Sequence, residues 1–265
     1  MSQSKKNNIL VGDIGNTETK IFFRNNKTEK KIVLKSTEMI YSKIKLKVFF
    51  LKKFNIKDKA VFCSVVPSNF RIIKKVFERE LKIKIVELKN IYKNKIIKLK
   101  VDKKQIGSDR LANAISVFNK KNNFIVVDFG TATTFDVVAA DGTYRGGVIA
   151  PGINLSLEAL YNAAARLPRI SISETKTNGS SIKTSNVIGK STKAAMHSGI
   201  FWGYIGLIEG IVTRIKHEFA KPMTVIGTGG LASIFYNATD SIDHIDEDIT
   251  NAGLVLIYKR NLPWR

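Results

Sequence analysis

Two stretches of the sequence place an acidic residue, a glycine and hydroxyl side chains directly after an apolar run. The later stretch, "VVDFGTATTFD" at residues 126–136, contains Asp128, Gly130, Thr131, Thr133 and Thr134. Glycine lets the backbone turn tightly and bring its N–H groups close to a ligand, and the hydroxyl groups donate further hydrogen bonds. An aspartate beside such a turn can hold a hydrated metal ion. The ligand that suits these groups is a phosphate chain with Mg²⁺.

An earlier stretch repeats this chemistry. "ILVGDIGNTETK", residues 9–20, contains Asp13, Gly15, Asn16, Thr17 and Lys20. Lys20 either places a point charge on a phosphate or is one more solvated lysine. A single Asp-x-Gly-Thr turn is more typical of a hairpin with local side-chain hydrogen bonds. Two copies, each after an apolar strand, favour two related halves that grip one polyphosphate from both sides.

A third glycine-rich turn and one helix start could complete such a site. In "VIGTGGLAS", residues 225–233, Gly229 and Gly230 permit close approach of a nucleotide, although glycine-rich turns are common. "QIGSDRLANAISVF" places Ser108, Asp109 and Arg110 at the start of an amphipathic helix. Residue chemistry alone favours a helix cap with a surface arginine. The functional alternative makes Asp109 a base for a hydroxyl group and Arg110 a contact for an anionic substrate.

The histidines and the single cysteine indicate structural roles. His197, His217 and His244 are too dispersed for a metal site defined by spacing, and Cys63 lies in the apolar run "AVFCSVV". A disulfide framework is excluded, which favours a reducing, cytosolic setting. The polar start "MSQSKKNN" does not resemble a signal peptide. The apolar stretch around Glu209 is too short to span a bilayer, so no membrane contact is expected.

The basic charge is concentrated in the first half of the chain. Residues 1–121 hold 27 Lys and 4 Arg against 10 acidic residues, whereas the remainder is nearly neutral. Such asymmetry is a hint of nucleic-acid or membrane contact. The surplus is nearly all lysine, is scattered, and accompanies many Ile and Asn residues, as a compositional bias would produce. Arginine, which makes bidentate base contacts, is scarce, so nucleic-acid binding is not expected.

The elements that must position these residues alternate between two kinds. Apolar, β-branched runs predict strands at residues 9–14, 20–23, 60–66, 83–88, 96–101, 124–129, 135–139, 147–149 and 223–227. Helical periodicity predicts helices at residues 40–54, 68–81, 107–121, 153–166, 186–219 and 250–259. This alternation favours an α/β fold.

The motifs, taken in order, resemble those of the type III pantothenate kinases, a family of the actin, Hsp70 and sugar-kinase superfamily. The matching pieces run from about residue 9 to 260: "DIGNT", "SVVP", "GSDR" where the family usually has Gly-Ala-Asp-Arg, "DFGTATTFDVV", "GGVIAPG", "LPRI", "SGIFWGYIGLIEG" and "GTGGLA". The resemblance implies two duplicated ribonuclease H-like (actin-like ATPase) domains, residues 1–118 and 119–265, with a nucleotide cleft between them.

The resemblance also implies a function. It is ATP-dependent phosphorylation of pantothenate to 4′-phosphopantothenate, the first step of coenzyme A synthesis, by a cytoplasmic homodimer that needs Mg²⁺ and a monovalent cation, K⁺ or NH₄⁺. Asp109 resembles the catalytic base. ATP and its phosphates would be bound by Asp13, Gly15, Asn16, Thr17, Lys20, Gly130, Thr131, Thr133, Gly229 and Gly230. Asp13 would hold Mg²⁺ and Asp128 the monovalent cation.

Pantothenate would be bound by Gly107, Ser108 and Arg110, and Thr192 would reach the substrate from the partner subunit. The chain departs from the family at Lys100, which stands at the position of a tyrosine in a Tyr-x-Asn-Pro-type segment. Two alternatives therefore stay open. One is a kinase for another small hydroxyl compound, and the other is a non-catalytic accessory or regulatory protein of the same fold.

Overall fold

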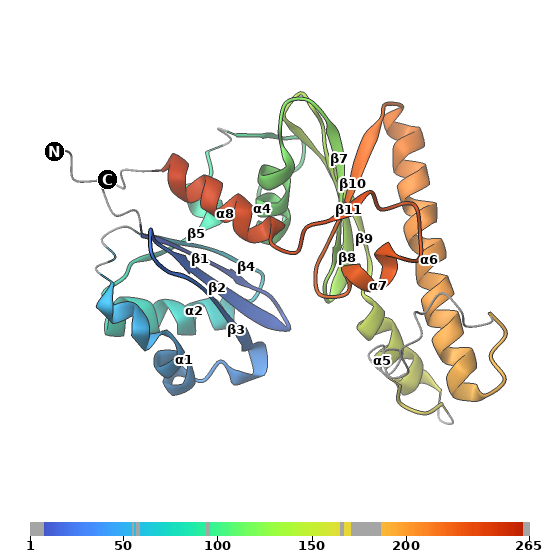
Figure 1. Cartoon of the computed structure of the whole chain (residues 1–265), viewed down its shortest axis with the longest axis horizontal. Helices are drawn as coiled ribbons and strands as arrows, with labels where there is room; N and C mark the ends of the chain where they lie inside the picture. The colour runs from blue at the N-terminus through green and yellow to red at the C-terminus, as the bar shows by residue number, and fades with distance from the viewer. Residues whose placement is uncertain are drawn as a thin grey trace. The chain divides into compact units, whose positions relative to one another are not determined.

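Apolar strands form two sheets that amphipathic helices cover, and the chain divides into two units (Figure 1). The computed structural model describes residues 8–54, 56, 59–93, 96–164, 167–170 and 187–261. One unit comprises residues 1–117 and 248–265, and the other comprises residues 118–247. Residues 165–166 and 186, at the ends of two helices expected from the sequence, lie outside the described residues.

The sheet of the first unit has the strand order β3-β2-β1-β4-β5. Its strands are β1 (Ile9–Ile14), β2 (Glu18–Arg24), β3 (Glu29–Lys35), β4 (Ala60–Ser64) and β5 (Ile85–Glu87). The first three form an antiparallel meander, whereas β4 pairs with β1 and β5 in parallel. Parallel pairing brings the carboxyl ends of β1 and β4 to the same edge of the sheet. That edge carries Asp13 and Ser64.

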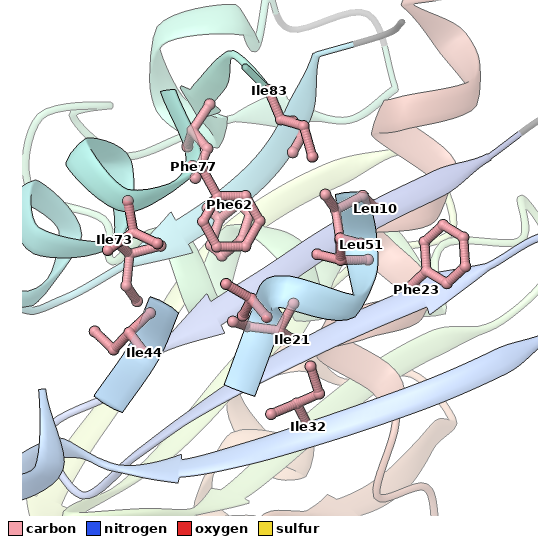
Figure 2. Close-up of a cluster of buried hydrophobic side chains, with 14 of the residues drawn as sticks. Leu10, Ile21, Phe23, Ile32, Ile44, Leu51, Phe62, Ile73, Phe77 and Ile83 are labelled. Atoms are coloured by element: carbon pink, nitrogen blue, oxygen red, sulfur yellow. The ribbon is translucent and has the colours of Figure 1, made fainter. Parts of the chain in front are cut away.

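Helices cover both faces of this sheet (Figure 1). Its helical elements are η1 (Ser36–Glu38), α1 (Tyr41–Val48), η2 (Phe49–Lys53), α2 (Pro67–Val76), η3 (Phe77–Leu81), α3 (Leu88–Ile91), α4 (Ser108–Val117) and α8 (Ile249–Arg260), and a two-residue strand, β6 (Lys98–Leu99), follows α3. Under α1, η2 and α2, alternate strand residues such as Leu10, Ile21 and Phe62 pack against Ile44 and Phe77 (Figure 2). This core fixes the strand register on which the site depends.

The last helix belongs to the first unit, although the sequence assigned residues 119–265 to one domain. The Thr250 hydroxyl at the start of α8 donates to Asn113 Oδ1 of α4 at 2.7 Å. Near the end of α8, the Tyr258 hydroxyl donates to the carbonyl of Asn8 at 2.7 Å. The chain thus leaves the first unit after Val117 and returns at Asp248, because the apolar face of α8 packs on α4 and β1.

The second unit repeats the topology of the first. Its strands are β7 (Asn123–Phe129), β8 (Ala132–Val138), β9 (Thr143–Pro151), β10 (Met223–Thr228) and β11 (His244–Ile245), and its helices are α5 (Ile153–Ala163), α6 (Thr192–Phe219) and α7 (Ala232–Tyr236). The strand order β9-β8-β7-β10-β11 matches β3-β2-β1-β4-β5, with an antiparallel meander followed by parallel pairings. The duplication expected from the two acidic turns is therefore present in the fold.

The 28-residue helix α6 packs along the sheet of the second unit (Figure 1). Its N-cap is Ser191, whose hydroxyl accepts a hydrogen bond from the Ala194 N–H, and it ends where Ala220 adopts a left-handed φ of 54°. Phe201, Tyr204 and Ile208 on its inner face pack with Phe235 of α7. Within the described residues, no helix has the length and apolarity that crossing a membrane requires.

Some elements differ from those expected. β3, "EKKIVLK", does not appear in the sequence-based assignment, because its lysines alternate with only Ile32 and Leu34 as buried residues. The strand expected at 96–101 is reduced to Lys98–Leu99, and the one at 147–149 is part of the longer β9. These differences lie at sheet edges, where pairing rather than local composition decides whether a strand forms.

Candidate active site

The turn from β1 to β2 holds the first acidic motif. The Gly15 N–H donates to the Glu18 carbonyl at 2.9 Å, which closes the turn. Ser36 fixes the turn from outside, since its N–H donates to the Thr17 carbonyl and its hydroxyl to the Gly15 carbonyl, both at 2.8 Å. Asn16 and Thr17 are exposed at the tip. Their side chains are thus accessible to a ligand on a turn whose backbone is already fixed.

Asp13 precedes this turn and is half-buried. The pKa of its carboxyl is raised from 3.8 to about 6, mainly by burial and also by the nearby charge of Asp109, while a hydrogen bond from Cys63 and the charge of Lys20 act in the opposite direction. The Cys63 S–H donates to Asp13 Oδ1 at 3.1 Å. Lys20 is the cross-strand partner of Asp13 in the β1–β2 register. A cation at Asp13 would offset the cost of burying this charge.

Asp109 lies in the first turn of α4, and its side chain is half-buried. Burial raises the pKa of its carboxyl, and the Arg110 backbone N–H, which donates to Asp109 Oδ1 at 2.8 Å, opposes that rise. A Cβ at position 107 would lie 2.4 Å from Asp109 Oδ1, so a larger residue there would displace the Asp109 carboxylate. The first unit therefore brings together the residues that the sequence predicted as base and first phosphate motif.

Ser108 is 1% exposed and fastens α4 to the end of β4. Its hydroxyl accepts from the Ser64 N–H at 3.1 Å and donates to the Ser64 carbonyl at 3.0 Å. It is a buried anchor for the helix start. Lys89, which the sequence did not single out, supports the segment just before it by donating to the carbonyls of Lys104 and Ile106 at 3.1 and 2.8 Å.

The turn from β7 to β8 holds the second acidic motif. Asp128 is half-buried at the end of β7, and Gly130 and Thr131 are exposed at the tip. The Gly130 N–H donates to the Ala132 carbonyl at 3.1 Å, and the Gly152 N–H donates to the Thr131 carbonyl at the same distance. This turn, like the first, is fixed by backbone hydrogen bonds and presents a hydroxyl group outward.

Thr133 differs from the phosphate contact that the sequence suggested. Its side chain is 1% exposed, and its hydroxyl shares a 2.8 Å hydrogen bond with the Tyr204 hydroxyl of α6. Tyr204 also donates to the carbonyl of Pro151. Thr133 thus points into the core of its unit, because alternate β8 residues face α6. The sequence shows this alternation but not which face α6 covers.

Asp136 is a buried carboxylate that the sequence analysis left without a role. It accepts hydrogen bonds from the Tyr144 hydroxyl at 2.5 Å and from the Thr134 hydroxyl at 3.2 Å. In the β7–β8 register Thr134 lies opposite Asp128. Asp136 therefore anchors the strand face that carries Asp128. Its position in "DFGTATTFD", on the same face as Thr134, is the signal that could have revealed it.

The third glycine-rich turn follows β10. Gly229 has a φ of +89°, and a Cβ there would lie 2.7 Å from the Phe129 carbonyl oxygen and 2.8 Å from Asp128 Oδ1. Only glycine fits a backbone that approaches Asp128 so closely. A Cβ on Gly230, in contrast, would meet nothing within 4 Å. Gly230 leaves open space beside the turn.

Thr192 and Lys100 are exposed. Thr192 is the first residue of α6 and lines a hollow of about 750 Å³ between α5 and α6, together with Leu160, Met196 and Ile200. Lys100 follows β6 in the first unit.

Asp13 and Asp128 each provide a carboxylate that could bind a cation together with phosphate oxygens. Within the described residues, no group of three or more His, Cys, Asp or Glu side chains is arranged to hold a metal ion. Mg²⁺ usually binds one or two carboxylates and completes its shell with water and phosphate oxygens, so half-buried Asp13 fits a magnesium–nucleotide complex. Asp128, beside the fixed backbone of the second turn, provides a carboxylate for a further cation.

Comparison with known proteins identifies the family. The sequence profile described as type III pantothenate kinase matches residues 9–214. The type III pantothenate kinase of Pelagibacter ubique is 46% identical over 253 residues, which cover 93% of this chain and 97% of that protein. The one from Caulobacter vibrioides is 47% identical over 210 residues, covering 78% and 77%.

Solved structures agree on the fold. A conserved Baf family transcriptional activator from Campylobacter jejuni superposes with a TM-score of 0.60 at 19% identity, covering 96% of this chain and 98% of that one. An archaeal actin homologue superposes with a TM-score of 0.52 at 12% identity, covering 95% and 100%. These likenesses confirm the predicted actin-like fold. Together with the sequence matches, they establish that the chain belongs to the type III pantothenate kinase family.

Proposed function

We propose that this protein transfers the γ-phosphoryl group of ATP to the primary hydroxyl of pantothenate, giving 4′-phosphopantothenate in coenzyme A synthesis. The observation that carries the proposal is the pair of half-buried carboxylates in the first unit. Asp109 begins α4, Asp13 ends β1, and the charge of Asp109 acts on Asp13. Two neighbouring half-buried carboxylates are costly for stability, and a kinase uses such a pair when the Mg²⁺ ion that accompanies ATP and an alcohol are bound.

The first turn provides the phosphate end of the site. The exposed side chains of Asn16 and Thr17 donate hydrogen bonds to phosphate oxygens, and Lys20 supplies a positive charge near Asp13. Asp13 would hold the Mg²⁺ ion, which would neutralise charge on the phosphates. Phosphoryl transfer is catalysed mainly by alignment and charge neutralisation, so a turn with a prefixed backbone suits this reaction.

Asp109 acts on the acceptor alcohol. Its carboxylate accepts the hydroxyl proton as the phosphoryl group is transferred, and the pKa of this carboxyl, raised by burial, makes it a stronger base than an exposed aspartate. The guanidinium of Arg110 binds the carboxylate of pantothenate, and Gly107 leaves space for the Asp109 side chain. Ser108 holds this helix start on β4, so the base keeps its position while the substrate is aligned.

The second unit binds the rest of the nucleotide. Gly130 and Thr131 contact phosphate oxygens through the exposed turn, whereas the buried Thr133 hydroxyl supports that turn from inside. Gly229 and Gly230 permit the approach of the nucleoside. Asp128 would hold a monovalent cation, K⁺ or NH₄⁺.

Activity should therefore fall strongly when K⁺ and NH₄⁺ are replaced by a larger organic cation such as tetramethylammonium at equal ionic strength and constant Mg²⁺. Unchanged activity would contradict the assignment of a monovalent cation to Asp128.

The protein acts as a cytoplasmic homodimer in which Thr192 contacts the substrate bound by the partner subunit. The outer face of α6 supports dimer formation, because small residues and an exposed apolar side chain there leave room for a partner subunit. A Cβ added to Gly199, Gly203 or Gly206 meets nothing within 4 Å, and Ile188, just before the helix, is 83% exposed. Light scattering should give twice the chain mass of 29.6 kDa. A monomer with full activity would remove the role of Thr192.

The test is product formation with the purified chain. ATP, Mg²⁺ and K⁺ are mixed with pantothenate, and ³¹P NMR is used to find a phosphate monoester on its primary hydroxyl. Pantetheine, glycerol and hexoses serve as competing acceptors, because Lys100 replaces the tyrosine expected in the pantothenate pocket. Phosphopantothenate as the main product supports the proposal. Preferential phosphorylation of another acceptor would make the protein a different kinase, and no transfer at all would favour the accessory-protein alternative.

A further inference from the structure

The thiol of Cys63 lies directly against the first acidic motif. Asp13 and Cys63 are Cα partners in the parallel pairing of β1 with β4, so their side chains share one face of the sheet. Cys63 is fully buried, and its S–H donates to Asp13 Oδ1 at 3.1 Å. The bond occupies one carboxylate oxygen and leaves the other, Oδ2, for a ligand.

The backbone that carries the thiol is fixed on its carboxyl side. The Val65 N–H donates to the Ile14 carbonyl at 3.1 Å, which ties the end of β4 to β1. The neighbouring Ser64 is held through its N–H and its carbonyl by the Ser108 hydroxyl at 3.1 and 3.0 Å. The Cys63 side chain is fully buried, which limits the room in which the thiol could follow a turning Asp13 carboxylate. The hydrogen bond therefore favours one orientation of that carboxylate.

The orientation of the Asp13 carboxylate matters because Asp109 is a neighbouring negative charge. The charge of Asp109 acts on Asp13, and repulsion between two carboxylates favours rotation of one away from the other. We propose that Cys63 is a positioning residue that holds the Asp13 carboxylate in the orientation required to bind magnesium–ATP. This inference rests on the proposed kinase function and adds to it a residue that touches neither substrate.

Three variants distinguish the effect of the hydrogen bond that Cys63 donates from the effect of how its side chain packs. Cys63→Ser keeps a donor with a smaller atom, Cys63→Val fills the site with a somewhat larger apolar side chain that has no donor, and Cys63→Ala removes the donor and leaves a smaller side chain. Binding of ATP in the presence of Mg²⁺ is measured by calorimetry without pantothenate, and the KM values of both substrates are measured separately. Unfolding in urea shows which variants are folded.

Cys63→Val and Cys63→Ala should weaken Mg–ATP binding about 10- to 100-fold, the range expected for loss of a hydrogen bond to a charged group. Cys63→Ser should stay within about threefold of the native protein, and the KM for pantothenate should be nearly unchanged in every folded variant. Unaltered Mg–ATP binding by folded Cys63→Val, or equal losses in Cys63→Ser and Cys63→Val, would overturn the inference. An inactive native protein would instead remove the kinase proposal itself.

Discussion

At the scale of single residues, the site depends on carboxylates that are expensive to bury. Burial raises the pKa of both Asp13 and Asp109, and for Asp13 the value is about 6. A raised carboxyl pKa means that the folded protein binds a proton more readily than the unfolded chain does. Stability from this proton is fully present below the ordinary pKa of 3.8 and is lost as the pH rises through about 6. Near neutral pH the ionised Asp13 therefore destabilises the ligand-free protein.

Replacement of Asp13 by asparagine should stabilise the ligand-free protein at pH 7.5. Asparagine resembles the protonated carboxyl and can still accept the Cys63 hydrogen bond, so the gain is about 1–3 kcal/mol, the cost of a shift of this size. The gain should shrink as the pH falls from 6 towards 4. Urea unfolding at pH 7.5 and 4.5, without Mg²⁺ or nucleotide, measures it.

Asp141 provides a matched control for this prediction. It is exposed, and a hydrogen bond from Thr143 holds the pKa of its carboxyl below the ordinary value. The change Asp141→Asn should therefore give no gain in the free energy of unfolding. A similar gain in both variants would indicate a general effect of net charge rather than relief of burial at Asp13.

Sequence chemistry singled out the acidic turns and the helix start as candidates for the site, but not the contacts that support them. The acidic turns and the "GSDR" helix start are local patterns, so spacing is enough to find them. The hydrogen bond from Cys63 to Asp13 joins residues 50 positions apart and depends on strand register. The burial of Thr133 likewise depends on which face of β8 the helix α6 covers. Neither fact is contained in a local pattern.

At the scale of elements, the acidic and glycine-rich motifs of each unit lie in turns at strand ends. Ser36 fixes the β1–β2 turn, and the Gly152 N–H fixes the β7–β8 turn. The turn after β10 relies instead on a glycine, since Gly229 combines a positive φ with close approach to Asp128. Strand ends predicted from apolar runs located these turns. The lysine-rich β3 was missed because its pairing with β2, not its composition, makes it a strand.

The contrast between Gly229 and Gly230 gives a prediction at this scale. Gly229→Ala should destabilise the protein by about 1–3 kcal/mol, because its Cβ meets the Phe129 carbonyl and its backbone is left-handed. Gly230→Ala should change the free energy of unfolding by less than about 0.5 kcal/mol, since its Cβ enters open space. Chemical denaturation of the two variants measures the difference. Equal effects would show that the turn relaxes to accommodate a side chain.

At the scale of the whole molecule, one strand topology occurs twice, and the chain crosses between the two copies two times. The second unit is one continuous segment, residues 118–247, whereas the first needs α8 from the end of the chain. The repeated acidic turns predicted the duplication. The return of α8 was not predicted, because an amphipathic helix does not reveal which of two sheets it covers.

This connectivity predicts unequal behaviour of fragments. Residues 118–247 expressed alone should unfold cooperatively in urea, as followed by far-ultraviolet circular dichroism. Residues 1–117 alone should lack a cooperative transition, because α4 and β1 lose the apolar face of α8 that covers them. Adding residues 248–261 to the 1–117 fragment through a flexible linker should restore its cooperative transition. A stable 1–117 fragment would show that α8 is dispensable for the first unit.

Asp109, proposed to accept the proton of the pantothenate hydroxyl during phosphoryl transfer, is tested by comparing the turnover number of Asp109→Asn with that of the native protein. Both are measured at saturating ATP, Mg²⁺, K⁺ and pantothenate, with Mg–ATP binding checked separately. The turnover number of Asp109→Asn should be lower by about 10²- to 10⁴-fold, the range for loss of a general base, with Mg–ATP affinity retained. Equal turnover by the two proteins would contradict the role of Asp109 as the base.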